Sequence, residues 1–246
     1  IELSSWRMGF AVLAVLSALA WVVMWWWVQD EAPAAGKRGW PALQNAWAEF
    51  VTLCRLPQTL GIVVLGAVTY AAYITLRGLW LGPLMIERFG MSLVQAGHVA
   101  LLMSVVALFG PAFFGRFDPK VPKRRTWIVR MTWFMALMFL VLAYSHIWWL
   151  TVGLAVLMSF LGGYMVLQYA DVRQSYTSAQ TGRAMAVFTM AMFLGIALMQ
   201  WCTGVVAAWA STWGADTYTA VLLAVGVCLF LGSTAFQVLP QAQQRT

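Results

Sequence analysis

The sequence predicts an all-α membrane protein with seven transmembrane helices. Of its 246 residues, 62% are apolar and only 9% are charged, whereas a soluble domain carries about 25% charged residues. Long apolar runs recur along the chain, and each could cross about 30 Å of hydrocarbon as a helix. None of these runs alternates polar and apolar residues with a period of two, so a transmembrane barrel is not expected. Together these observations exclude a soluble globular enzyme and a disordered chain.

Seven apolar runs define the expected spans. In chain order they cover residues 6–28, 58–81, 93–115, 127–145, 147–169, 184–210 and 217–239. The longest connection, residues 29–57, places Leu43, Trp47, Phe50 and Val51 at helical spacing. We expect an amphipathic helix there, either lying in the membrane interface or packed on the cytoplasmic face as a soluble helix.

The basic residues predict the orientation of the helices. Lys and Arg total 15. Twelve of them fall in or near the loops after spans one, three and five or at the C-terminus, while only Arg7 and Arg88 fall on the opposite side. Loops rich in Lys and Arg face the cytoplasm. The C-terminus is therefore expected to be cytoplasmic and the N-terminus to lie across the membrane, which agrees with an odd number of spans.

The sequence lacks the residue patterns of several other membrane and soluble classes. A retinal protein needs a lysine in its last span, and residues 221–239 contain none. The only histidines, His98 and His146, lie in different parts of the chain without a second pair for haem or copper. The three cysteines have no metal-ligand spacing. We expect no catalytic residues, cofactor or metal, and no nucleic-acid partner, because the net charge of +7 follows from the basic loops.

One loop carries a recognisable motif. Residues 110–125 read GPAFFGRFDPKVPKRR and lie between two spans on the basic side. They resemble the loop signature of the major facilitator superfamily, and the residues that match it by type are Gly115, Asp118, Lys120, Arg124 and Arg125. The Gly-to-Asp spacing is one residue short and Pro122 replaces the second glycine, which suits the degenerate second copy of the motif. The resemblance implies a gating loop, and a plain positive-inside anchor is the alternative.

Further stretches match the order of that family's twelve helices. SSWRMGF and QDEAP flank the first apolar run as they flank the sixth helix, residues 77–97 resemble the seventh and eighth, and residues 181–209 resemble the eleventh. The resemblance implies that residues 1–28 are the sixth helix, residues 29–57 a cytoplasmic linker with an amphipathic helix, and residues 58–246 the C-terminal six-helix bundle. The chain is thus expected to be a piece of a longer transporter.

The same resemblance implies a function. The family consists of secondary transporters that move small solutes by alternating access between two helical halves. The expected partners are the lipid bilayer, the missing N-terminal half and a small-molecule substrate, and the expected location is a bacterial inner (plasma) membrane. A non-catalytic membrane subunit or scaffold of a larger complex is the alternative, because such subunits leave no residue signature.

Arg77 is the main candidate for substrate binding, because an ionisable residue inside a span is costly and usually functional. Tyr70, Tyr73 and Arg77 fall at i, i+3 and i+7 and are expected to share one helix face. The guanidinium suits a carboxylate, phosphate or sulfonate, which favours an organic anion. Alternatively, Arg77 extends to the outer interface. Gln200 and Tyr164 are expected to bond either the substrate or a neighbouring helix.

The acidic residues are expected to lie outside the span cores. Glu87 follows the second apolar run, and Asp171 follows the fifth on the basic side. If protons drive transport, the proton-binding carboxylate is then expected in the N-terminal half, or His98 takes its place.

Overall fold

The computed structural model describes residues 6–27, 51–120 and 123–239. These residues are almost entirely helical, with no strand among them, and seven of the helices are long and apolar enough to cross a membrane. The predicted all-α membrane fold with seven spans is confirmed. The chain forms two units, residues 1–47 and 48–246. Most of the expected linker, including its amphipathic helix, lies outside the described residues, although residues 51–55 are helical.

The first unit contributes one helix, α1 (Trp6–Trp27). Its 22 residues rise about 33 Å at the usual 1.5 Å per residue, enough to cross the hydrocarbon. Three consecutive tryptophans, Trp25 to Trp27, end the helix, as is typical of the membrane interface.

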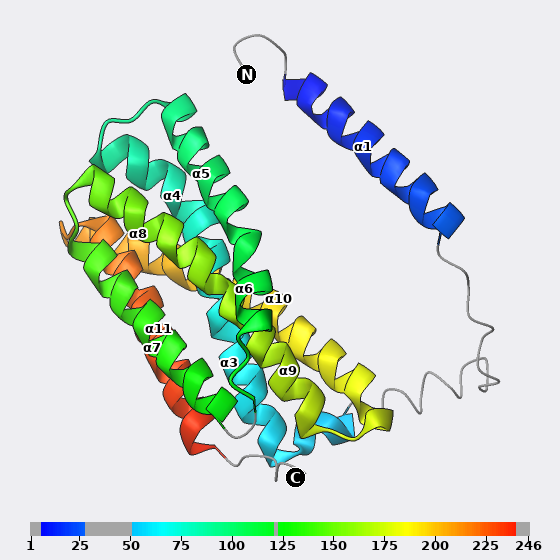
Figure 1. Ribbon diagram of the computed structural model, residues 1–246. Helices are drawn as coiled ribbons and strands as arrows, with labels where there is room; N and C mark the ends of the chain where they lie inside the picture. The colour runs from blue at the N-terminus through cyan, green and yellow to red at the C-terminus, as the bar shows by residue number, and fades with distance from the viewer. Residues whose placement is uncertain (1–5, 28–50, 121–122, 240–246) are drawn as a thin grey trace. The chain divides into compact units, whose positions relative to one another are not determined.

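The second unit is a bundle of six spans (Figure 1). In chain order the spans are Gln58–Arg88, Leu93–Arg116, Lys123–Tyr144, Trp148–Ser175, Ser178–Thr212 and Thr217–Val238. The most extensive packing joins α3 (Pro57–Thr75) to α10 (Ser178–Thr212), and α11 (Thr217–Val238) to both α3 and α7 (Lys123–Tyr144). On another side of the bundle, α5 (Leu93–Ala107) packs against α8 (Trp148–Leu161).

Three spans are interrupted. Span two continues from α3 through two wide π-helical turns, η1 (Leu76–Trp80) and η2 (Leu84–Arg88), on either side of α4 (Leu81–Pro83). Pro83 cannot donate to the carbonyl four residues earlier, which is that of Leu79 in η1.

A similar interruption in span three separates α5 from α6 (Phe109–Arg116), and the ring of Pro111 would meet the carbonyl of Ala107 in a continuous helix. Span five passes from α8 through the tight turn η3 (Gly162–Tyr164) to α9 (Met165–Ser175).

Several spans are longer than their apolar runs. Span two ends at Arg88 rather than near residue 81, and span five ends at Ser175 rather than near residue 169. Glu87 and Asp171, which follow the apolar runs, therefore lie in the last turns of these helices. Both side chains are hydrogen-bonded to other helices, which allows the helices to continue past the apolar residues.

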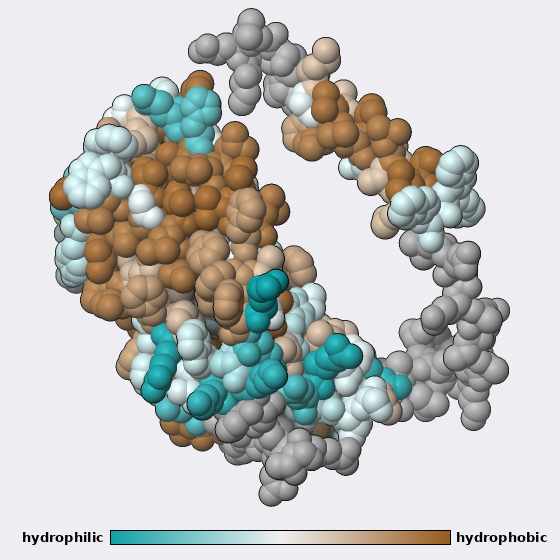
Figure 2. Space-filling model, in the orientation of Figure 1, coloured by the Kyte–Doolittle hydropathy of each residue, from teal (hydrophilic) through white to brown (hydrophobic). Residues whose placement is uncertain are grey.

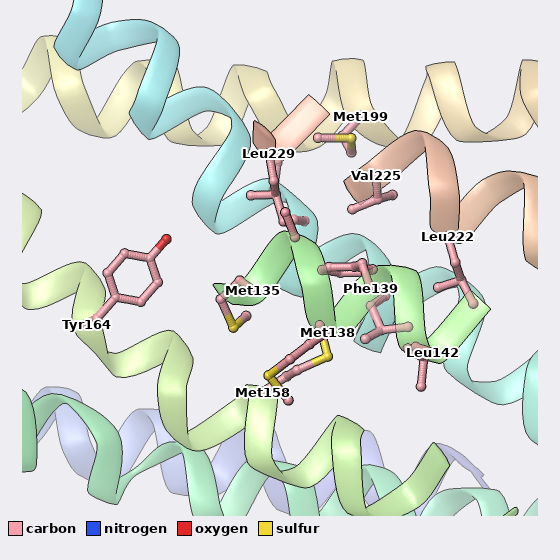
Figure 3. Close-up of a cluster of buried hydrophobic side chains, with 14 of the residues drawn as sticks. Met135, Met138, Phe139, Leu142, Met158, Tyr164, Met199, Leu222, Val225 and Leu229 are labelled. Carbon is pink, nitrogen blue, oxygen red and sulfur yellow. The ribbon is translucent and has the colours of Figure 1, made fainter. Parts of the chain in front are cut away.

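The core of the bundle is apolar and rich in methionine and leucine (Figure 3). In this cluster Phe139 of α7 lies on the side of α11, near Val225, whereas Met135 lies on the side of Tyr164. The outer surface is apolar as well. Brown side chains cover the flank of the bundle in Figure 2, and hydrophilic residues gather at the end where α7 begins and α9 ends. This distribution matches a helical bundle surrounded by lipid.

Candidate functional site

A cavity of about 240 Å³ lies inside the bundle and brings together three of the five candidate side chains, Tyr70, Tyr73 and Tyr164. It is lined by residues of spans two to five. The other lining residues are Thr69, Ala107, Pro111, Met135, Ser159, Gly162, Gly163, Met165, Val166 and Tyr169. The walls are thus mostly apolar, with a few hydroxyl groups, which is the usual make-up of a small-molecule site.

Glycines at the two helix breaks allow the cavity walls to approach one another. A Cβ atom on Gly163 of η3 would come within 2.5 Å of the Cα atom of Gly110 in α6. No real Cβ atom is found at such a distance from main chain, so neither position accepts a side chain without separation of the helices. The small residues therefore hold spans three and five together beside the cavity.

The three tyrosine hydroxyls differ in what they bind. The hydroxyls of Tyr164 and Thr132 lie 2.9 Å apart and form a buried hydrogen bond between spans five and four. Tyr70 makes an edge contact with the ring of Phe193, at 6.4 Å between ring centroids. The hydroxyl oxygen of Tyr73 is buried and has no hydrogen-bond partner among the described residues. The Tyr73 hydroxyl is therefore a polar atom of a cavity residue that remains available to bind a solute.

Arg77 does not join this cavity. It lies in the wide turn η1, and its Nη2 donates a 2.5 Å hydrogen bond to the Ser104 hydroxyl in α5. The Nε atom of Arg77 is buried without a partner among the described residues. The expected common face with Tyr70 and Tyr73 assumed a continuous α-helix, and the π-helical turn that begins at Leu76 changes the angular spacing.

The length of span two also bears on the alternative for Arg77. The helix continues eleven residues past Arg77 to Arg88, or about 16 Å at 1.5 Å per residue. Arg77 therefore lies farther from the outer end of its helix than the apolar run suggested, and an extension of its side chain to the outer interface is less favoured. π-Helical turns inside α-helices are frequent at functional sites.

Gln200 lies apart from the cavity. It is half-buried in α10, and its main-chain carbonyl accepts a hydrogen bond from the Thr203 hydroxyl. The same hydroxyl accepts a 3.1 Å hydrogen bond from Nε1 of Trp80 in span two. The polar contact between these two spans is thus made by Thr203, not by the Gln200 side chain.

The loop motif is held together by ion pairs. The Arg124 guanidinium binds both carboxylate oxygens of Asp118, with a distance of 2.9 Å from Nε to Oδ1. Its Nη1 donates to Gln174 of α9 at 2.5 Å. Lys120 adopts a left-handed backbone conformation (φ 57°), and its N–H donates to Asp118. Gly115 lies next to the end of span three at Arg116, and a Cβ atom there would meet only Val166, at 3.9 Å.

Arg125 makes a second, buried ion pair in the same region. Its Nε donates to Oδ1 of Asp171 at 2.9 Å, and its Nη2 donates to the Ser175 hydroxyl at 3.0 Å. The guanidinium also lies over the ring of Phe236, 5.6 Å from the ring centroid. The motif residues therefore fasten the start of α7 to the end of α9 and to α11.

The Asp118–Arg124 pair predicts a pH dependence. Hydrogen bonds from Arg124 hold the pKa of the Asp118 carboxyl below its usual range, against partial burial, which raises it. A lowered carboxyl pKa stabilises the fold above the unfolded value of about 3.9, and this stabilisation is lost as the pH falls through the folded value. We expect Asp118→Asn to lower the melting temperature at pH 7, and the difference from wild type to vanish below about pH 3. A difference that persists unchanged at that pH contradicts the assignment.

Sequence reasoning missed a polar cluster at the opposite end of the bundle. Arg88 pairs with Asp216, its Nη1 donates to the Ala143 carbonyl at 3.2 Å, and it lies over the ring of Tyr218. The Tyr218 hydroxyl in turn donates to Glu87 at 2.5 Å. A partial signal was present, because Asp216 precedes α11 and caps it through the Thr219 N–H. Within the described residues, no group of three His, Cys, Asp or Glu could hold a metal ion.

Comparison with known proteins agrees with this architecture. The sequence profile described as Major Facilitator Superfamily matches residues 1–198 and, in a second overlapping match, residues 79–245. A similar solved structure is that of a bacterial homologue of the human lysosomal transporter Spinster, in an inward-facing and unoccupied conformation. The TM-score is 0.60 at 13% identity, and the match covers 94% of this chain but 60% of the other. No match was found among curated proteins.

Proposed function

The chain belongs to the major facilitator superfamily, and from this premise we propose that it forms the C-terminal half of a secondary transporter that moves a small solute by alternating access. The 240 Å³ cavity beside the free Tyr73 hydroxyl is the observation that carries this proposal. Membership of the family is equally compatible with a non-transporting scaffold. A cavity in the bundle that is lined by apolar side chains and a few hydroxyl groups, by contrast, is suited to binding a small solute.

We further propose the division into parts that the sequence suggested. Residues 1–28 act as the sixth helix, residues 29–57 as a cytoplasmic linker, and residues 58–246 as the C-terminal bundle. The bundle pairs with an N-terminal half, and the cavity opens toward that half when the two rock against each other. The protein resides in the inner (plasma) membrane of a bacterium with its C-terminus in the cytoplasm, since twelve of its 15 basic residues gather on that side.

The proposed substrate is a small organic anion or zwitterion. Arg77 stays charged, lies one turn beyond Tyr73, and has a buried Nε that no described residue binds. A carboxylate or phosphate can take paired hydrogen bonds from a guanidinium. The Tyr73 hydroxyl and the aromatic wall of the cavity supply a place for the rest of the solute.

Uptake into proteoliposomes tests this proposal. We expect the 246-residue chain alone to show no uptake, because the proposed solute pathway lies between two halves. The chain joined to its N-terminal half is expected to take up a labelled organic anion and to leave a labelled organic cation outside. Robust uptake by the chain alone contradicts the pairing of halves, and no uptake of any solute by the joined protein favours the scaffold alternative.

Ser104 offers a test of how Arg77 is held. The Ser104 hydroxyl accepts from Arg77 and donates to the Ala100 carbonyl at 2.6 Å, so it fixes one end of the guanidinium. A hydrogen bond to a charged group contributes about 1.5 kcal/mol or more, so we expect Ser104→Ala to raise the KM for an anionic solute roughly tenfold with little change in maximal rate.

Ser211→Ala is the matched control for Ser104→Ala, because among the described residues the exposed Ser211 hydroxyl bonds only a carbonyl of its own helix. Its KM is expected to equal that of the wild type. Equal KM values for Ser104→Ala and Ser211→Ala argue against any role of Ser104 in holding Arg77.

A further inference from the structure

Two neighbouring buried side chains of α9 each have a polar atom without a hydrogen-bond partner among the described residues. Gln168 and Asp171 are three residues apart and so share a helix face, and they are only 2% and 3% exposed. Oδ1 of Asp171 accepts from Arg125, but Oδ2 has no hydrogen-bond partner among the described residues, and neither has Nε2 of Gln168. Unpaired polar atoms of this kind destabilise a buried site.

The Thr69 hydroxyl fixes the oxygen end of the Gln168 amide. It shares its one proton between the Leu65 carbonyl, at 3.0 Å, and Oε1 of Gln168, at 3.1 Å. Nε2 is then the atom of the amide without a partner, and it can only donate, whereas Oδ2 of Asp171 can only accept.

A small cavity of about 10 Å³ lies against both residues. Gln168 and Asp171 are its polar lining residues, and the remaining lining residues are apolar. This volume is about that of one water molecule, and a buried water needs at least two polar partners. A donor and an acceptor on residues that line one cavity call for a group that both accepts and donates, which water does and which no apolar wall residue can do.

We propose that one buried water occupies this cavity, accepts a hydrogen bond from Nε2 of Gln168 and donates one to Oδ2 of Asp171. The water completes a hydrogen-bonded chain from Arg125 through Asp171, the water and Gln168 to Thr69. Thr69 also lines the 240 Å³ cavity. The chain therefore joins the buried ion pair of the basic loop region to the wall of the cavity. The water site stands independently of the proposed function.

A structure of the full-length protein at about 2 Å resolution tests the site directly. We expect one solvent peak at roughly 2.6–3.2 Å from both side chains. In Gln168→Met the peak is expected to disappear, while in Gln200→Met, a control in α10 outside the small cavity, it is expected to remain. A cavity without density, or a direct hydrogen bond between Gln168 and Asp171, overturns the proposal.

Thermal stability gives a second, independent measurement. If the water joins the two side chains, the losses in melting temperature caused by Gln168→Met and Asp171→Asn are expected to be non-additive in the double variant. The losses caused by Gln200→Met and Asp171→Asn are expected to add. Additive behaviour of both pairs overturns the bridge, and if Asp171→Asn does not fold, the solvent peak alone decides.

Discussion

Gly195→Ala is expected to lower the melting temperature of the protein by on the order of 10 °C. A Cβ atom at Gly195 of α10 would lie 2.6 Å from both the Cα and the carbonyl carbon of Ala67 in α3. These are main-chain atoms, so no side-chain rotation relieves the clash, and the two helices must separate. The pair α3 and α10 forms the most extensive packing of the bundle, so separation affects much of the fold.

Gly204→Ala provides the matched control for this change. Gly204 lies in the same helix, but a Cβ atom there would meet nothing within 4 Å. Alanine in a helix interior is favoured over glycine by roughly 0.5–1 kcal/mol, so the control is expected to melt at or slightly above the wild-type temperature. Thermal melts of the three proteins in one detergent make the comparison. Equal melting temperatures for the two variants contradict the close crossing.

The spans could be predicted from the sequence because membrane crossing depends on local hydropathy. About 20 apolar residues suffice whatever the rest of the chain does, and all seven predicted runs are helices in the structure. The ends of the spans could not be read in this way. Arg88 and Asp171 lie in helices because partners on other spans bind them. These partners are distant in sequence, so the hydropathy of the neighbouring residues does not predict them.

The candidate site was predictable only in part, for a related reason. Tyr70 and Tyr73 share a helix face as predicted and line one cavity, and Tyr164 lines the same cavity. The face shared with Arg77 was predicted from a regular α-helix, whereas Arg77 lies in the wide turn at Leu76–Trp80 and does not line this cavity. In the loop motif, the ion pair of Asp118 and Arg124 joins residues close in sequence, so it could be expected from the sequence. The ion pair of Arg125 and Asp171 joins residues 46 positions apart, and only the folded structure shows that they meet.

The buried guanidinium of Arg77 leads to the second large effect, on transport. In the joined, full-length transporter, Arg77→Ala is expected to reduce uptake of an anionic solute by on the order of 100-fold, because charge-assisted paired hydrogen bonds contribute about 3 kcal/mol. Uptake by Arg77→Lys is expected to lie between that of wild type and that of Arg77→Ala, since lysine keeps the charge but loses the planar fork.

The double variant tests whether Ser104 acts through Arg77. In Arg77→Ala the Ser104 hydroxyl has no guanidinium to hold, so Ser104→Ala is expected to cause no further loss of uptake in that background.

Arg130→Ala supplies the control that separates this role from a general loss of positive charge. Arg130 is exposed on α7, on a span that contributes only Met135 to the cavity lining, so its removal is expected to leave uptake unchanged. Initial uptake rates and solute binding, measured for a panel of anions, zwitterions and cations, make the distinction. If every solute binds Arg77→Ala as tightly as wild type, the guanidinium serves only to join span two to span three through Ser104. The preference for an anion then loses its basis, because Arg77 is the charged residue nearest in sequence to the free hydroxyl of Tyr73.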